Sequence, residues 1–267
     1  MQPFERLRRL ARDPGPAGDE ADQWFVAEAA DCLAGFADDP AGLVVACRRL
    51  LAHHPTAGVL WWLCSHVLTA PDAAEAAWEA SRRLDGDRTA ERLRDWLPFP
   101  HDETIAVLEW PPVIGAALSE RTDLDLAVVP RRDGDGRLRS RLRIAGANAR
   151  LVREHELTGS EPSHLLVEAH AASPTDAVVP AGALDLAREL AARGATVVLV
   201  SGLGRVLPER LMTALRRGVD PTDPHSPWEL LPLDAVQRVA TPVGLRDPAD
   251  LARQVDCPIA PELLRLT

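Results

Sequence analysis

The feature that most constrains the fold of this chain is a strand, helix, strand pattern between His164 and Gly202. A short apolar run over 164–170 is followed by a turn with proline and threonine, a helical stretch from about Gly182 and a second apolar run over 196–202. This spacing predicts one parallel βαβ unit, and such units carry their ligand chemistry at the carboxyl ends of the strands. The residues at those ends are Glu168, His170, Ser201 and Gly202.

The composition indicates a globular chain without a strong attraction to polyanions. The 267 residues are 46% hydrophobic, which is enough for one large domain or two modest ones. Acidic residues outnumber basic ones by 40 to 30, and the net charge is -10. We therefore expect no nucleic-acid partner and no anionic membrane partner. The sequence also lacks a run of about 18 apolar residues and a signal peptide, so we expect a cytoplasmic protein.

The first part of the chain has the apolar spacing of helices. Up to Pro98 this spacing predicts about four to six helices. Breaks between them are expected at 38–40, at 54–56 and at 69–72, where aspartate, threonine and proline gather. The tandem Trp61-Trp62 is expected to form core and a helix or subunit contact rather than a ligand platform. Four isolated cysteines are expected to be reduced core residues, at Cys32, Cys47, Cys64 and Cys257.

After Pro100 short apolar runs alternate with helical stretches. Strands are expected over 104–108, 124–129, 149–153, 164–169 and 196–200, with helices over 113–118, 136–145 and 182–192. Strands separated by single helices predict a mainly parallel, doubly wound sheet with helices on both faces. We therefore expect an α/β fold in which a helical N-terminal domain over 1–98 precedes a Rossmann-like domain over 99–267.

Several common site signatures are missing from the sequence. Gly202-Leu203-Gly204 follows a strand, but Leu207 occupies the place of the third glycine of the dinucleotide fingerprint. There is no GxSxG elbow, P-loop or HExxH motif, and the histidines lack the spacing of metal ligands. We therefore expect no cofactor and no metal.

One loop has the composition of a phosphate site. Arg131, Arg132 and Arg137 surround two glycines, and a helix is expected to begin at Gly136. Guanidinium groups beside the amides of a helix N-terminus suit a phosphate. The alternative is a solvated basic loop that continues into Arg139, Arg141 and Arg143.

The order of parts resembles a known superfamily, namely the alpha, beta and delta subunits of initiation factor 2B together with methylthioribose-1-phosphate and ribose-1,5-bisphosphate isomerases. After the second strand, Arg131, Asp135, Gly136 and Arg137 fit the spacing of the family motif. Gly182 falls in register with the glycine of the family's Asn-Lys-x-Gly-Thr motif. The resemblance implies the sugar-phosphate isomerase/CoA-transferase-like fold, a ligand that is a sugar phosphate or a nucleotide, and a homodimer built through the C-terminal region.

The chemistry expected from that family is altered in this chain. The resemblance implies a catalytic cysteine near the end of the first strand and an aspartate after the fourth. The first strand instead ends in Glu109-Trp110, and His170 replaces the aspartate. Glu109, Glu168 and His170 would share one edge of the sheet and could form a different acid-base set.

Two functions follow from this combination. The first is a divergent, non-catalytic relative that binds a phosphorylated small molecule or a protein partner through the inherited pocket. The second is an active aldose-ketose isomerase of sugar phosphates with a replaced catalytic pair.

Overall fold

The helical layer occupies the part of the chain whose apolar spacing is helical. The computed structural model describes residues 5, 19–96, 103–131, 136–159, 161–219, 223 and 225–265. Within these residues the layer consists of α2 (Asp19–Ala34), α3 (Pro40–His53), α4 (Gly58–Thr69), α5 (Ala73–Asp85) and α6 (Thr89–Trp96). The domain boundary expected near Pro98 lies outside the described residues.

Two of the predicted breaks are capped helix starts. The Asp39 side chain accepts a hydrogen bond of 2.9 Å from the Gly42 amide, and Pro40 occupies the first turn of α3. The Asp72 side chain accepts one of 2.9 Å from the Glu75 amide at the start of α5. Such caps contribute about 0.5–2 kcal/mol each, because they satisfy amides that the helix itself leaves unpaired.

The central sheet has seven strands in the order β10-β9-β7-β4-β1-β2-β3. Their bounds are Thr104–Leu108 (β1), Asp125–Val129 (β2), Ala149–Leu151 (β3), His164–Glu168 (β4), Thr196–Val200 (β7), Arg238–Thr241 (β9) and Gly244–Arg246 (β10). All neighbours are parallel except β10 and β9. The sequence order reverses between β1 and β4, and this is the point where doubly wound sheets form a ligand crevice.

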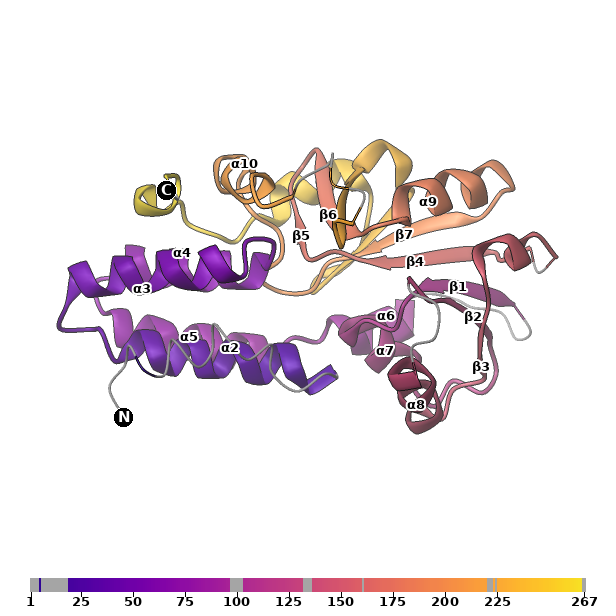
Figure 1. Ribbon diagram of the computed structural model, residues 1–267, viewed down its shortest axis with the longest axis horizontal. Coiled ribbons are helices and arrows are strands. Elements are labelled where there is room, and N and C mark those ends of the chain that lie inside the picture. The colour runs from indigo at the N-terminus through magenta and orange to yellow at the C-terminus, as the bar shows by residue number, and fades with distance from the viewer. Residues whose placement is uncertain are drawn as a thin grey trace.

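Helices cover both faces of this sheet (Figure 1). One face packs against α6, α7 (Pro112–Leu118) and α8 (Gly136–Ala145), and the other packs against α9 (Ala183–Ala192). Strands β1, β2, β4 and β7 are buried on both faces, which explains why their sequences are continuous apolar runs rather than alternating ones. The predicted fold, a helical segment followed by a mainly parallel sheet with helices on both faces, is confirmed.

A second, antiparallel sheet was not expected from the sequence. It consists of β5 (Ala171–Ala172), β6 (Asp176–Pro180) and β8 (Trp228–Pro232). The stretch between β4 and α9, predicted as a turn, is therefore a hairpin. Its partner β8 lies far along the chain, so local spacing carries no signal for the pairing.

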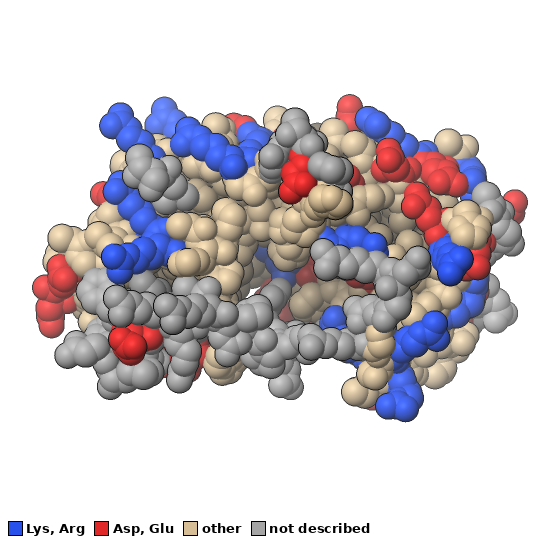
Figure 2. Space-filling view, viewed as in Figure 1, with Lys and Arg blue, Asp and Glu red and all other residues tan. Residues whose placement is uncertain are grey.

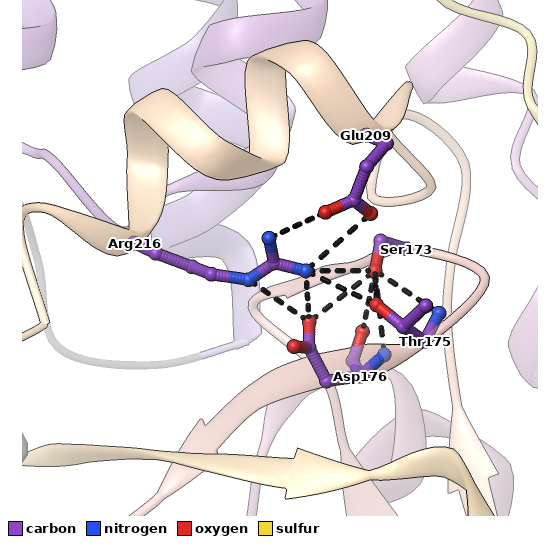
Figure 3. A network of polar contacts seen from close by, with 5 residues as sticks. All are labelled: Ser173, Thr175, Asp176, Glu209 and Arg216. Atoms are coloured by element: carbon purple, nitrogen blue, oxygen red, sulfur yellow. Dashed lines mark hydrogen bonds and ion pairs between the residues drawn. The ribbon is translucent and has the colours of Figure 1, made fainter.

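The hairpin is fixed to α10 (Glu209–Arg216) by a polar network (Figure 3). The Arg216 guanidinium lies 2.8 Å from an Asp176 carboxylate oxygen and 2.6 Å from a Glu209 oxygen. It also donates to the hydroxyls of Ser173 and Thr175 in the hairpin turn. The arginine bond holds the pKa of Glu209 below its ordinary value. The network therefore sets where the hairpin and its neighbours lie.

One apolar core joins the helical layer to the second sheet and to the end of the chain. Trp61 and Trp62 are fully buried in it, which confirms the prediction that they form core. The Trp62 indole donates to the Asp256 carbonyl at 2.6 Å. Figure 1 shows α10 and the C-terminal segment lying along α3 and α4, on the side opposite to α2 and α5. This segment includes the 3₁₀ turn Pro261–Leu263, whereas the turn Pro248–Gln254 packs beside β9 through Leu251. Two more 3₁₀ turns are Glu154–Gly159 and Leu233–Ala235.

In the described part of the chain, every helix is too short or too polar to cross a bilayer.

Helix α4 begins where its backbone touches the residues that follow β4. The Gly58 amide donates to the His170 carbonyl at 3.0 Å. A Cβ atom at residue 58 would lie 2.6 Å from that carbonyl oxygen and 2.8 Å from the Ala171 Cβ. Only glycine therefore allows this approach of the helical layer to the sheet.

We predict that Gly58→Ala destabilises the protein by about 1–3 kcal/mol, because the new methyl group forces two backbones apart. Urea unfolding measures this change. Gly86→Ala is the matched control, since a Cβ there would lie 3.5 Å from its nearest neighbour. Equal stability of the two variants would contradict the close approach.

Candidate functional site

The carboxyl edge of the sheet carries the residues that the sequence singled out. Glu109 follows β1, Arg131 follows β2, and Glu168 and His170 lie at the end of β4. Glu109 adopts a left-handed φ of 59°, which is uncommon for a residue with a side chain. Its carboxylate lies 3.4 Å from the Arg131 guanidinium. The structure thus brings Glu109 together with Arg131, whereas the Glu168 carboxylate meets the start of α7 and Arg205.

Glu168 is buried and its oxygens are already bound. One carboxylate oxygen accepts hydrogen bonds from the amides of Val113 and Ile114, at 2.9 and 3.1 Å, in the first turn of α7. The other lies 2.8 Å from the Arg205 guanidinium. The carboxylate therefore fixes α7 against β4 and neutralises a buried cation.

Arg205 was not among the residues expected from the sequence. It follows the loop Gly202–Gly204 at the carboxyl end of β7, and only 8% of its surface is exposed. Besides Glu168, it donates to the Ala169 carbonyl at 2.6 Å. The signal that could have found it is an arginine five residues after a strand end, directly after the Gly202-Leu203-Gly204 loop.

His170 is held as a neutral ring. Its ring packs against the Trp228 ring, with the centroids 3.7 Å apart and the planes tilted by 51°. Burial lowers the pKa of His170 from its usual 6.5 to about 3, and the charges of Arg205 and Arg131 add to the effect.

A cavity of about 470 Å³ opens between the helical layer and the α/β part. Figure 2 shows this face hollowed where the two parts meet. Phe25, Val26 and residues 53–57, 59 and 60 line it from the helices, and His170, Arg205 and residues 226–228 line it from the other side. A second cavity of about 220 Å³ shares Val26, Val59 and Arg205 with the first. Arg205 therefore lies in the wall between two compartments of one cleft.

The helical wall of the cavity favours a negatively charged ligand. Helix α4 has no acidic residue in its first turn and no side-chain cap, and Ala57, Val59 and Leu60 at this end line the cavity. The positive end of the helix dipole therefore lies at the cavity that Arg205 also lines, and the Arg205 charge itself is balanced by Glu168.

The predicted phosphate residues are spread over two other places. Gly182, with φ of 93°, precedes α9, and the Leu184 amide there donates to the Glu229 carboxylate at 2.6 Å. A phosphate at this helix start would have to displace Glu229. Gly136 lies exposed at the start of α8. Arg132, Asp135 and the side chain of Arg137 lie outside what the structure describes.

Arg131 reaches across the edge of the sheet to the cavity wall. Its guanidinium donates to the Pro227 carbonyl at 2.5 Å, and the Ala181 amide donates to the same oxygen at 3.1 Å. Arg131 thereby links the end of β2 to the segment that carries Trp228.

Over the residues that are described, no group of three or more histidine, cysteine, aspartate or glutamate side chains could hold a metal.

Known structures share this fold over almost the whole chain. Translation initiation factor eIF-2B from Pyrococcus horikoshii OT3 matches with a TM-score of 0.73 and 14% identity, over 95% of this chain and 98% of that one. The eIF2B beta subunit from Chaetomium thermophilum matches at 0.66 and 16%, over 94% and 89%. The 5-methylthioribose 1-phosphate isomerase from Pyrococcus horikoshii OT3 matches at 0.61 and 14%, over 94% and 86%.

The matches are structural, since no family model and no curated protein matches the sequence. They are initiation-factor-2B and isomerase structures, the group that the sequence resemblance named, and they confirm the fold predicted from it. At such low identity the likeness establishes the fold.

We predict that Glu168→Leu costs about 3–5 kcal/mol of stability, because it leaves the buried Arg205 charge without its carboxylate. The double variant Glu168→Leu with Arg205→Met should recover the part of this loss that comes from the unpaired Arg205 charge, but not the part that comes from the Val113 and Ile114 amides, which lack the Glu168 acceptor in both variants. Urea unfolding of both single variants and the double variant gives the coupling free energy. Additive losses would show that the pair is not coupled.

We predict that neutral burial of His170 makes stability fall as the pH is lowered. In the unfolded chain the His170 ring binds a proton below about pH 6.5, whereas in the folded chain it does so only near pH 3. The contribution of the neutral ring to the free energy of unfolding is therefore complete above about pH 6.5 and is lost as the pH falls toward 3. Unfolding free energies measured between about pH 7 and pH 4 should depend less on pH in His170→Asn than in the wild type. The same substitution at exposed His225 is the control. An unchanged slope in His170→Asn would contradict the prediction.

Proposed function

We propose that this chain binds a phosphorylated small molecule in the cavity between its helical layer and its α/β part, and that it does so without catalysis. The observation that carries the proposal is the Glu168–Arg205 pair. It places a guanidinium in the wall of the cavity while both oxygens of the nearby carboxylate are engaged.

The anionic part of the proposal rests on charge and size. Arg205, whose guanidinium is paired with Glu168, lines the same cavity as the start of α4, where the helix dipole favours an anion. The volume of about 470 Å³ lies within the range of small-molecule sites. These features suit a small molecule that carries one phosphate group.

The non-catalytic part rests on the acid-base groups. A general acid or base works best when its pKa lies near the working pH and its proton is within reach of the substrate. His170, with a pKa of about 3, is a weak base, and Glu168 is fixed to the amides of α7. Glu109 is paired with Arg131. An active sugar-phosphate isomerase is the alternative, and it requires at least one of these groups to be released.

The proposal extends to assembly. The resemblance implies a homodimer formed through residues 230–267, and part of this region packs inside the chain, where the Glu262 carbonyl accepts from Arg48 at 2.9 Å. We propose that the rest of the region makes the subunit contact. Light scattering coupled to gel filtration should give twice the mass of 29.0 kDa, and a monomer would contradict it.

Ligand binding is tested by thermal shift and calorimetry with ribose 5-phosphate and adenosine 5′-monophosphate. At least one compound should stabilise the wild type. Ala57→Glu places a carboxylate in the cavity wall at the start of α4, where the helix dipole tolerates it, and should weaken binding by about tenfold or more. The matched control Ala57→Gln should retain binding.

Two results would contradict the proposal. If neither compound binds the wild type, the cavity is not a phosphate site. If ribose 5-phosphate is converted to a ketose, followed by NMR, the non-catalytic part is wrong and the isomerase alternative holds.

A further inference from the structure

The two arginines beside the cavity differ in how firmly their counterions are held. Arg205 is paired with Glu168, whose side chain is only 2% exposed and whose second oxygen is bound by two amides of α7. Arg131 is paired with Glu109 at 3.4 Å, and 39% of the Glu109 side chain is exposed. The partly exposed carboxylate can exchange its arginine for water at little cost, whereas the buried one cannot. Arg131 is therefore the arginine with an exchangeable counterion.

Arg131 has donor capacity that its protein partners leave unused. One terminal nitrogen donates to the Pro227 carbonyl, which anchors the guanidinium beside a residue of the cavity wall. The buried Nε makes no hydrogen bond to any residue that the structure describes, because the Glu109 oxygen 3.4 Å away lies outside hydrogen-bond geometry. Burial, Arg205 and then Arg131 lower the pKa of His170, which lines the cavity, so the Arg131 charge reaches that wall.

Glu109 is placed beside Arg131 by a backbone in an uncommon conformation. Its amide donates to the Val129 carbonyl at 2.8 Å, at the end of the strand that leads to Arg131. Its φ of 59° is left-handed, which is unfavourable for a residue with a side chain. Strain of this kind persists where the surrounding structure fixes it, and it is concentrated at ligand sites. The backbone of Glu109 is therefore fixed, and its side chain is the part that can move away from Arg131.

We propose that Glu109 is an exchangeable counterion of Arg131, which an anionic ligand must displace, and that Glu109 thereby sets the affinity of the cavity for phosphate compounds. A phosphate that enters takes over the guanidinium, including its Nε–H, and repels the carboxylate toward solvent. The displaced Glu109 moves away from the ligand, so it gains no role in proton transfer. The inference rests on the proposed function and names the residue that determines the affinity of the same site.

The test measures the binding of ribose 5-phosphate and adenosine 5′-monophosphate by calorimetry in the wild type and in Glu109→Gln, which keeps the side-chain length and removes the charge. Both compounds should bind about three- to tenfold more tightly to Glu109→Gln, because no carboxylate has to be displaced. Glu120→Gln is the matched control, since Glu120 also has a left-handed φ, of 64°, and is exposed outside both compartments. Its affinities should stay within about twofold of those of the wild type.

Two further variants show whether the effect passes through Arg131. Arg131→Gln should weaken binding by about tenfold. The double variant Arg131→Gln with Glu109→Gln should bind no more tightly than Arg131→Gln alone, because no counterion is left to release. An undiminished gain in the double variant would overturn the proposal, since the carboxylate would then act on the ligand without Arg131.

A crystal structure of the wild type with ribose 5-phosphate gives the same answer if Arg131→Gln unfolds. The Glu109 carboxylate should lie more than about 4 Å from the Arg131 guanidinium in that complex, beyond the reach of an ion pair. An intact Glu109–Arg131 pair beside the bound phosphate would overturn the exchange.

The outcomes separate this inference from the function on which it rests. Equal or weaker binding in Glu109→Gln than in the wild type would overturn counterion exchange and leave the anion site standing. If neither compound binds the wild type or Glu109→Gln, the proposed function fails and this inference fails with it.

Discussion

The arrangement of the cleft depends on the buried carboxylate of Glu168. It joins three parts of the molecule, because it ends β4, binds the first amides of α7 and pairs with Arg205 in the loop after β7. A buried ion pair adds little net free energy of folding, but removing one of its two partners is strongly destabilising. The main effect of the pair is therefore to fix the positions of the segments that carry it. The same carboxylate that holds the arginine in the cavity wall is thereby unavailable for proton transfer.

The walls of the cavity are held in place by contacts within the protein. Gly58 lets α4 reach the His170 backbone, and the Arg216 network holds the hairpin whose strand β6 pairs with β8, the strand that begins at Trp228. Each wall of the cavity is thus positioned by contacts that do not involve a ligand. A site of this kind loses little conformational entropy on binding, which favours affinity.

Much of the fold could be predicted from sequence, and the site only in part. Buried parallel strands are continuous apolar runs, so β1, β2, β4 and β7 are visible locally. The pairing of β6 with β8 joins segments far apart in the chain and leaves no periodic signal. The edge position of Glu168 and His170 followed from strand order, whereas the role of Arg205 depends on a loop conformation that spacing does not encode.

The core that unites α3 and α4 with Cys257, Ala260 and Leu263 has a consequence for biosynthesis. The helices are synthesised before residues 257–263, and the apolar surface that they present to those residues is covered only when the residues have been made. During elongation this surface is exposed to other chains and to chaperones. The helical layer is thus synthesised before residues 257–263 and completes its packing only after them.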